Sequence, residues 1–210
     1  IGLVNRCLSV VVEAVDAQAG YVDKFIGDAV MALWNAPAMQ ADHARLALDA
    51  ALTAIERLAT AEAGSADPLT FRIGLETGEA SVGNMGTEGR LAYTAIGDTV
   101  NIAARLEALC KVYGVPILAG PGLASALRGS GLLVLDDVVP SGLSRAIPIH
   151  VPLSCVPRDE ALRFADAHAL AEAGEAGAAR HAFASLGASG GRLAVAARLR
   201  ASRLANPEGA

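Results

Sequence analysis

The sequence predicts an α+β fold in which helices alternate with β-hairpins and a helical tail follows. Three observations support this class. Apolar residues recur at helical spacing over residues 1–19, two β-type runs flank a glycine turn at 21–34, and an alanine-rich stretch follows at 38–63. This repeated order of helix and hairpin is typical of a sheet that carries helices on one face.

The first helix and the first hairpin are marked by spacing and by glycine. In residues 1–19 the apolar side chains share one helical face: Val4, Leu8, Val11 and Val15. Two β-type runs, at 21–25 and 29–34, are separated by a tight turn that includes Gly27, so they are expected to form a hairpin. Asp28 lies at the tip of this hairpin, where an aspartate is usually a turn-forming residue.

The same alternation continues to Pro152, which closes a first domain that we place at residues 1–153. An alanine-rich helix at 38–63 is expected to be scaffold and to be followed by a loop at 64–68. The further predicted elements are strands at 70–76, 79–83, 91–95, 116–119, 132–139 and 146–151, a turn at 86–89, a helix from about 98 to 113 and a short helix at 122–128.

Residues 154–210 differ in composition, because they are rich in alanine and arginine. Helical segments are predicted near 158–173, 175–186 and 190–205, broken at Gly174 and at 187–191. Together they are expected to form a small helical hairpin, which is too small to close a repeat solenoid and should pack on the first domain or on a partner. His168 and His181 have no ligand-like neighbours and are expected to be incidental surface residues.

Composition limits the classes of function. The net charge is −5 and the 17 lysines and arginines are scattered, which argues against a nucleic-acid surface. No run reaches the roughly 18 apolar residues of a membrane span, so we interpret the chain as soluble and cytoplasmic, without a membrane segment. Its three distant cysteines fit neither a disulfide framework nor a zinc site. There is no initiator methionine or signal peptide, and the chain is expected to begin within a domain.

The predicted helix after Asp98 presents a polar pair beside its apolar stripe. The stripe consists of Ile102, Leu106, Leu109 and Tyr113. Asn101 and Arg105 are four residues apart and therefore share a face to the side of it. A guanidinium offers fixed donors to phosphate oxygens, and an asparagine can hydrogen-bond a sugar oxygen. On spacing alone, an ordinary solvated helix flank is the more frequent explanation.

Three sequence motifs favour a functional role for Asn101 and Arg105 over an ordinary solvated helix flank. VDKFIGDAVMALW at 22–34, ETGEASVGNMG at 76–86 and YTAIGDTVNIAARLE at 93–107 follow one another at plausible intervals. With them, residues 1–152 resemble the catalytic domain of class III adenylate and guanylate cyclases of the bacterial type. The resemblance implies a ferredoxin-like cyclase sheet and a lyase that converts ATP to cyclic AMP and pyrophosphate in intracellular signalling. It also implies a head-to-tail homodimer with two composite sites, each with two Mg²⁺ or Mn²⁺ ions.

The resemblance assigns roles to single residues. Lys24 would donate to a ring nitrogen of the base and Thr94 would accept from its exocyclic amine, a pairing that favours adenine. A guanine-specific member would typically have Glu and Cys at these places. Asn101 would orient the ribose, and Arg105 would stabilise charge on the α-phosphate during attack by the 3′-hydroxyl. Asp28 would be a metal ligand.

The chain departs from the family pattern at two places. The family's first metal aspartate lies on an opening strand in an F-x-D-I-x-G-F-T motif, which would precede Ile1, so the first strand and that ligand are expected to be missing. Near the C-terminal strands, Ser141 and Gly142 replace the family's Lys-Gly pair, and Arg145 is the nearest cation that could contact the triphosphate.

Two hypotheses about function remain open. The first is an adenylate cyclase domain that is active in its complete form, and the resemblance implies fusion to a sensory or membrane region upstream. The second is a non-catalytic cyclase-homology module that serves regulation or dimerisation, because loss of one metal carboxylate would suffice to prevent the reaction. A plain structural α+β domain would make three coherent motifs accidental.

Overall fold

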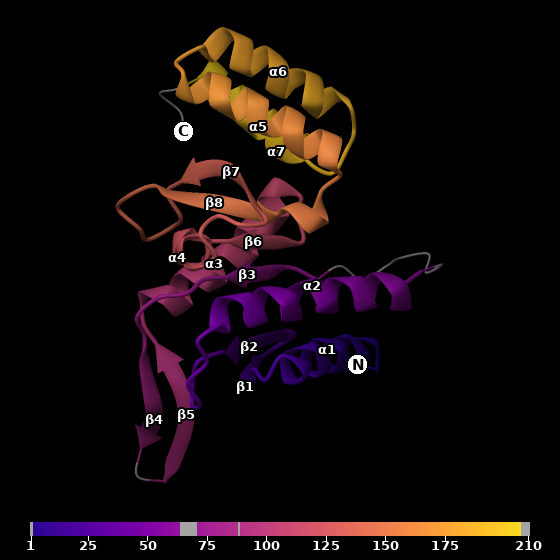
Figure 1. Cartoon of the computed structure of the whole chain (residues 1–210). Coiled ribbons are helices and arrows are strands. Elements are labelled where there is room, and N and C mark those ends of the chain that lie inside the picture. Colours follow the sequence, from indigo (N-terminus) through magenta and orange to yellow (C-terminus); the bar gives the residue numbers. More distant parts are fainter. Residues whose placement is uncertain (1, 64–70, 88, 207–210) are drawn as a thin grey trace. The chain divides into compact units, whose positions relative to one another are not determined.

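The computed structural model divides the chain into two compact units (Figure 1). It describes residues 2–63, 71–87 and 89–206. The first unit comprises Ile1–Phe71 and Leu75–Asn101, and the second comprises Arg72–Gly74 and Ile102–Ala210. Helix α3 (Asp98–Tyr113) runs through the point of division, so one helix contributes residues to both units. Helices and antiparallel strands occur in both units, which confirms the predicted α+β class.

The first unit packs two helices and a β-hairpin together. These elements are α1 (Gly2–Ala17), β1 (Tyr21–Ile26), β2 (Ala29–Leu33) and α2 (His43–Ala61). Helix α1 contacts α2 and both strands, and it buries Cys7, Ala14 and Val15. The indole of Trp34 donates a hydrogen bond of 3.0 Å to the Gln18 carbonyl, which ties the chain after β2 to the chain after α1.

The long helix predicted at 38–63 begins only at His43. Asn35 and Gln40 exchange hydrogen bonds between side chain and backbone at 2.8 and 2.6 Å, and Gln40 also donates to the Ala19 carbonyl. These side chains satisfy backbone groups that a helix would otherwise have to pair, so the stretch between β2 and α2 stays irregular.

The second hairpin of the first unit consists of β4 (Ser81–Thr87) and β5 (Arg90–Ile96), which pair antiparallel along their whole length. The turn predicted at 86–89 is wrong in part, because Gly86 still pairs with Leu91 in the ladder. The loop predicted at 64–68 lies outside the described residues.

The second unit contains a four-stranded sheet in the order β3-β6-β8-β7. Its strands are β3 (Ile73–Leu75), β6 (Ile117–Ala119), β7 (Leu132–Val138) and β8 (Ile147–Pro152), with the short helices α4 (Pro121–Ala126) and η1 (Leu153–Cys155) between or after them. Helix α3 buries Leu106, Cys110 and Tyr113 in this unit. Gly74 lets β3 approach α3 closely, because a Cβ there would overlap the Ala103 carbonyl.

The C-terminal segment forms the three predicted helical segments, which make a three-helix arrangement rather than a hairpin. They are α5 (Arg158–Glu172), α6 (Ala176–Ala188) and α7 (Ala194–Ala205). Phe164 and Phe183 meet edge to face with ring centroids 5.0 Å apart. Both belong to one apolar core with Leu135 of β7 and Leu106 of α3, so the helical tail packs on the sheet of its own unit (Figure 1).

Candidate active site

The structure brings Lys24 of β1 and Thr94 of β5 into contact, although they are 70 residues apart in the sequence. Nζ of Lys24 donates a hydrogen bond of 2.8 Å to Oγ1 of Thr94. Thr94 is 6% exposed, whereas the Lys24 side chain is 41% exposed. The pair therefore presents an accessible ammonium above a covered hydroxyl.

A third residue of this cluster, Asp23, was missed by sequence reasoning. The Thr94 hydroxyl donates to Oδ2 of Asp23 at 2.6 Å, and Nζ of Lys24 lies 3.6 Å from the same oxygen. The Asp23 side chain is fully buried, and its Oδ1 has no hydrogen-bond partner among the described residues. The signal available in the sequence was an acidic residue directly before Lys24 within a β-type run. We call Asp23, Lys24 and Thr94 the base cluster.

Asn101 and Arg105 lie one turn apart on the continuous helix α3. The hydroxyl of Thr99 donates to the Glu79 carbonyl at 2.8 Å, which fixes the first turn of this helix in the first unit. Asn101 is exposed and Arg105 is half-buried. Among the described residues of the second unit, no carboxylate lies within ion-pair distance of the Arg105 guanidinium.

The loop between β7 and β8 lies beside Arg105. A Cβ built on Gly142 would be 2.9 Å from Nη2 of Arg105, so the guanidinium rests against the backbone of this loop. Gly142 also has φ of +77°, a backbone conformation that side chains rarely adopt. Arg145, three residues further on, is exposed. The loop that touches Arg105 therefore carries a second cation.

Asp28 is exposed on the β1–β2 turn, where Gly27 has φ of +63°. The turn explains the residue types, because the left-handed conformation favours glycine. No group of three or more His, Cys, Asp or Glu residues within 2–63, 71–87 and 89–206 could hold a metal ion. Asp28 thus offers one carboxylate, and the residues present do not fit a two-metal site by themselves.

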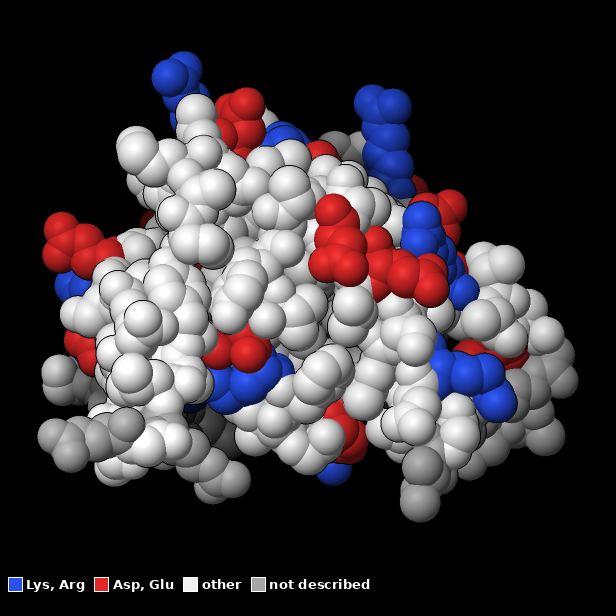
Figure 2. Space-filling view, turned by 90° about the horizontal axis from the view of Figure 1, so that it is seen from below, with Lys and Arg blue, Asp and Glu red and all other residues white. Residues whose placement is uncertain are grey.

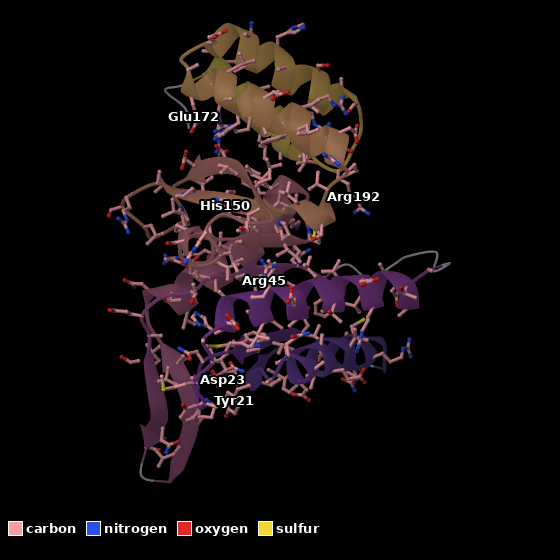
Figure 3. All side chains as sticks on the ribbon, viewed as in Figure 1. Tyr21, Asp23, Arg45, His150, Glu172 and Arg192 are labelled. Carbon is pink, nitrogen blue, oxygen red and sulfur yellow. The ribbon has the colours of Figure 1, made fainter. Side chains whose placement is uncertain are left out.

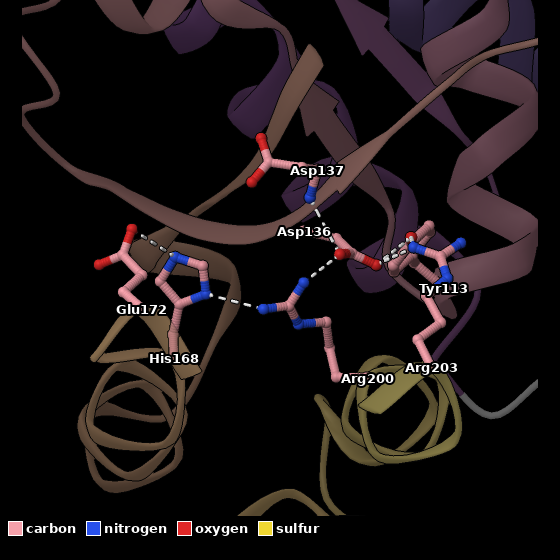
Figure 4. A network of polar contacts seen from close by, with 7 residues as sticks. All are labelled: Tyr113, Asp136, Asp137, His168, Glu172, Arg200 and Arg203. Atoms are coloured by element: carbon pink, nitrogen blue, oxygen red, sulfur yellow. Dashed lines mark hydrogen bonds and ion pairs between the residues drawn. The ribbon is translucent and has the colours of Figure 1, made fainter. Parts of the chain in front are cut away.

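A second polar cluster, which the sequence did not predict, lies in the second unit (Figure 4). The carboxylate of Asp136 on β7 is 1% exposed and accepts hydrogen bonds from Arg200 and Arg203 of α7. The hydroxyl of Tyr113 at the end of α3 donates to Oδ2 at 2.7 Å, and the Asp137 amide donates to Oδ1 at 2.9 Å. Burial and the hydrogen bond to Asp136 raise the pKa of Tyr113, so it stays a donor.

His168 belongs to the edge of this second cluster rather than to the incidental surface. Its Nδ1 lies 3.2 Å from Nη2 of Arg200, and its Nε2 lies 3.6 Å from Glu172 (Figure 4). The His168 side chain is only 14% exposed. His181 is exposed, in agreement with its predicted surface position.

Thiol chemistry and a large charged surface find no support in the described residues. Burial raises the pKa of Cys7, Cys110 and Cys155, to about 12 for Cys110, so these thiols are poor nucleophiles.

On the face drawn in Figure 2, acidic and basic side chains are interspersed among uncharged ones. None of the described helices has both the length and the apolar character that crossing a bilayer requires.

Comparison with known proteins gives the family. A model of the adenylate and guanylate cyclase catalytic domain matches residues 1–118, and the chain belongs to this family. Adenylate cyclase 1 of Rhizobium meliloti (strain 1021) is 42% identical over 132 residues, which are 61% of this chain and 20% of that protein. The chain thus spans about a fifth of the length of this curated relative.

Solved structures give the same fold for both kinds of cyclase. The adenylyl cyclase CyaB from P. aeruginosa is 28% identical with a TM-score of 0.63, over 71% of this chain and 79% of that chain. The guanylyl cyclase Cya2 is also 28% identical, with a TM-score of 0.58, over 70% of this chain and 78% of that chain. The likeness confirms the cyclase fold and leaves the choice of base to the residues of the site.

Proposed function

We propose that this chain is the catalytic domain of an adenylate cyclase, which forms cyclic AMP and pyrophosphate from ATP in intracellular signalling. The observation that carries the proposal is the contact between Lys24 and Thr94. A lysine ammonium can only donate hydrogen bonds, whereas the threonine oxygen beside it can accept them. Adenine offers the complementary pair, an acceptor ring nitrogen next to an amine donor. Guanine has a ring N–H and a carbonyl at these positions and does not match.

The residues of α3 fit the phosphate end of the substrate. In the reaction the 3′-oxygen forms a bond to the α-phosphorus, the bond to pyrophosphate breaks, and the hydroxyl proton leaves to solvent. Arg105 carries a positive charge that no carboxylate among the described residues of its unit neutralises, so it can stabilise the charge that develops on the α-phosphate. Asn101, one turn earlier, would orient the ribose. Arg145 would contact the triphosphate from the neighbouring loop.

The assembly and the metals belong to the same proposal. We infer a cytoplasmic homodimer with composite sites, in which residues 1–153 carry the chemistry and 154–210 are a helical tail that supports α3 through Tyr113. Mg²⁺ or Mn²⁺ would serve the reaction, with Asp28 as one ligand. Because the described residues include no group of three or more ligand-type side chains that could hold a metal, they do not explain the metal requirement by themselves.

A non-catalytic cyclase-homology module is the second candidate. The observation that favours it is the same incomplete metal set around Asp28. Such a module would keep the nucleotide contacts and the dimer surface but would form no product.

Arg105→Ala separates the two candidates. Cyclic AMP formation from ATP is measured with Mn²⁺ for the intact gene product and for the variant, and we expect a loss of about 10²–10³-fold in kcat with little change in KM. Lys111→Ala, at an exposed position of the same helix, is the matched control and should keep the rate. Nucleotide binding without cyclic AMP in the unaltered protein would reject the enzyme and favour the module.

A further inference from the structure

We propose that Asp23 is a specificity-determining residue, which orients the Thr94 hydroxyl so that this side chain can only accept a hydrogen bond from the base. The base cluster would thereby select a 6-amino purine and reject a 6-oxo purine. This inference rests on the proposed function, because it concerns the same nucleotide site. It goes beyond the proposed function because it assigns the selection between purine bases to a buried carboxylate that does not contact the base.

The hydrogen-bond inventory of Thr94 leads to this conclusion. A hydroxyl has one proton to donate and two lone pairs to accept with. Lys24 can only donate, so the 2.8 Å contact uses one lone pair. Oδ2 of Asp23 accepts from Thr94 at 2.6 Å, so this contact uses the single proton of the hydroxyl. One lone pair remains, which suits an exocyclic amine and repels a carbonyl oxygen.

The local backbone explains how two neighbouring residues reach the same hydroxyl. In a regular strand Asp23 and Lys24 would point to opposite faces. The pairing of β1 with β2 shifts between Val22 and Lys24, which is the signature of a β-bulge at Asp23. Nearby on the same strand, Tyr21 (labelled with Asp23 in Figure 3) packs edge to face on Tyr93, with ring centroids 5.6 Å apart. The bulge and this aromatic contact hold the carboxylate under Thr94.

The burial of Asp23 is difficult to explain by stability alone. Its side chain has no exposed surface, yet Oδ1 has no hydrogen-bond partner within the described residues. An unpaired buried carboxylate oxygen is unfavourable and rare in native structures. A carboxylate kept for structure would be satisfied on both oxygens, whereas one kept to orient a hydroxyl needs only Oδ2.

The test compares ATP with inosine triphosphate, which differs from it at the 6-position and the adjacent ring nitrogen and lacks the 2-amino group of guanine. Equilibrium binding of both nucleotides is measured for the intact gene product and for Asp23→Leu and Asp23→Ala, which both remove the acceptor of the Thr94 proton. Asp16→Asn, at an exposed position of α1, is the matched control, and thermal unfolding verifies that each variant is folded. We expect the preference for ATP to fall by about tenfold in both Asp23 variants and to persist in the control.

Binding and turnover distinguish the two ways in which these proposals can fail. An unchanged ATP preference in folded Asp23→Ala overturns the inference, and if that variant does not fold, Asp23→Leu, which also lacks an acceptor for the Thr94 hydroxyl, decides in the same way. If the unaltered protein forms cyclic AMP and the Asp23 variants keep its preference for ATP, the inference about Asp23 is rejected and the catalytic function stands. A tenfold loss of preference in a protein that forms no cyclic AMP supports the inference and rejects the catalytic function.

Discussion

Asp23 in the first unit and Asp136 in the second are both buried carboxylates, yet their surroundings differ. Asp136 is satisfied on both oxygens, by two arginines, a tyrosine and a backbone amide. Asp23 is satisfied on one oxygen only, and its cation, Lys24, is 41% exposed. We call the Asp136 cluster closed, because its carboxylate has no free lone-pair site even though Nε of Arg200 is buried without a partner among the described residues, and the base cluster open. The comparison teaches that a carboxylate satisfied on both oxygens stabilises a fold, whereas the open cluster keeps donors and acceptors for a ligand.

The closed cluster should have the largest effect on stability. Asp136→Ala leaves the mostly buried Arg200, and the partly exposed Arg203, without their counter-charge, and removing one partner of a buried pair typically costs about 3–5 kcal/mol. We expect a loss of this size in the free energy of unfolding, measured by denaturant titration. Asp137→Ala, at the exposed next position, is the control, and equal losses for the two variants would contradict the distinction.

The open cluster should affect selectivity and turnover. Thr94→Val removes the acceptor for the base amine, and kcat/KM for ATP should fall about 100-fold, because a site built around a hydrogen bond responds strongly to its loss. Thr94→Ser keeps the hydroxyl and should stay within a few-fold of the unaltered protein. If serine and valine were equally damaging, the side chain would act through packing rather than as an acceptor.

The smallest expected effect concerns pH. Burial lowers the pKa of His150 on β8 below its ordinary value of 6.5, against smaller opposing effects of the Ala119 carbonyl and Asp137. Below pH 6.5 the unfolded chain binds the proton more readily than the folded one, so stability falls as the pH falls. We expect His150→Gln to reduce the loss of Tm between pH 7 and 5 by about 2 °C. His181→Gln, on the surface of α6, should leave the slope unchanged.

The features of the fold and the site that depend on short-range sequence patterns could be predicted from the sequence. The elements followed from periodicity. Lys24 and Thr94, which the structure brings into contact, were selected from motifs, and the roles proposed for them depend on their fixed positions in those motifs. Asp23 was missed because strand alternation directs it away from Lys24, and a single-residue bulge leaves no trace in the period. The start of α2 was misplaced because the side-chain bonds of Asn35 and Gln40 replace a helical turn.

The polar cluster around Asp136 could not be predicted from the sequence, for a different reason. Asp136 lies 64 and 67 residues from Arg200 and Arg203, and each of them taken alone resembles an ordinary solvated charge. These residues form a network only because α7 packs near β7, and no local sequence pattern predicts that packing.

The most direct test of the distinction between the open and closed clusters is a crossed comparison of Asp23→Leu and Asp136→Leu, which remove every side-chain acceptor at these positions. For each variant, ATP affinity and the free energy of unfolding are measured on the same preparation. We expect Asp23→Leu to weaken ATP binding while stability changes by less than about 1 kcal/mol, and Asp136→Leu to lower stability by several kcal/mol while its folded fraction binds ATP normally. The opposite pattern, or equal loss of both properties in both variants, would contradict the assignment of one cluster to the ligand and the other to the fold.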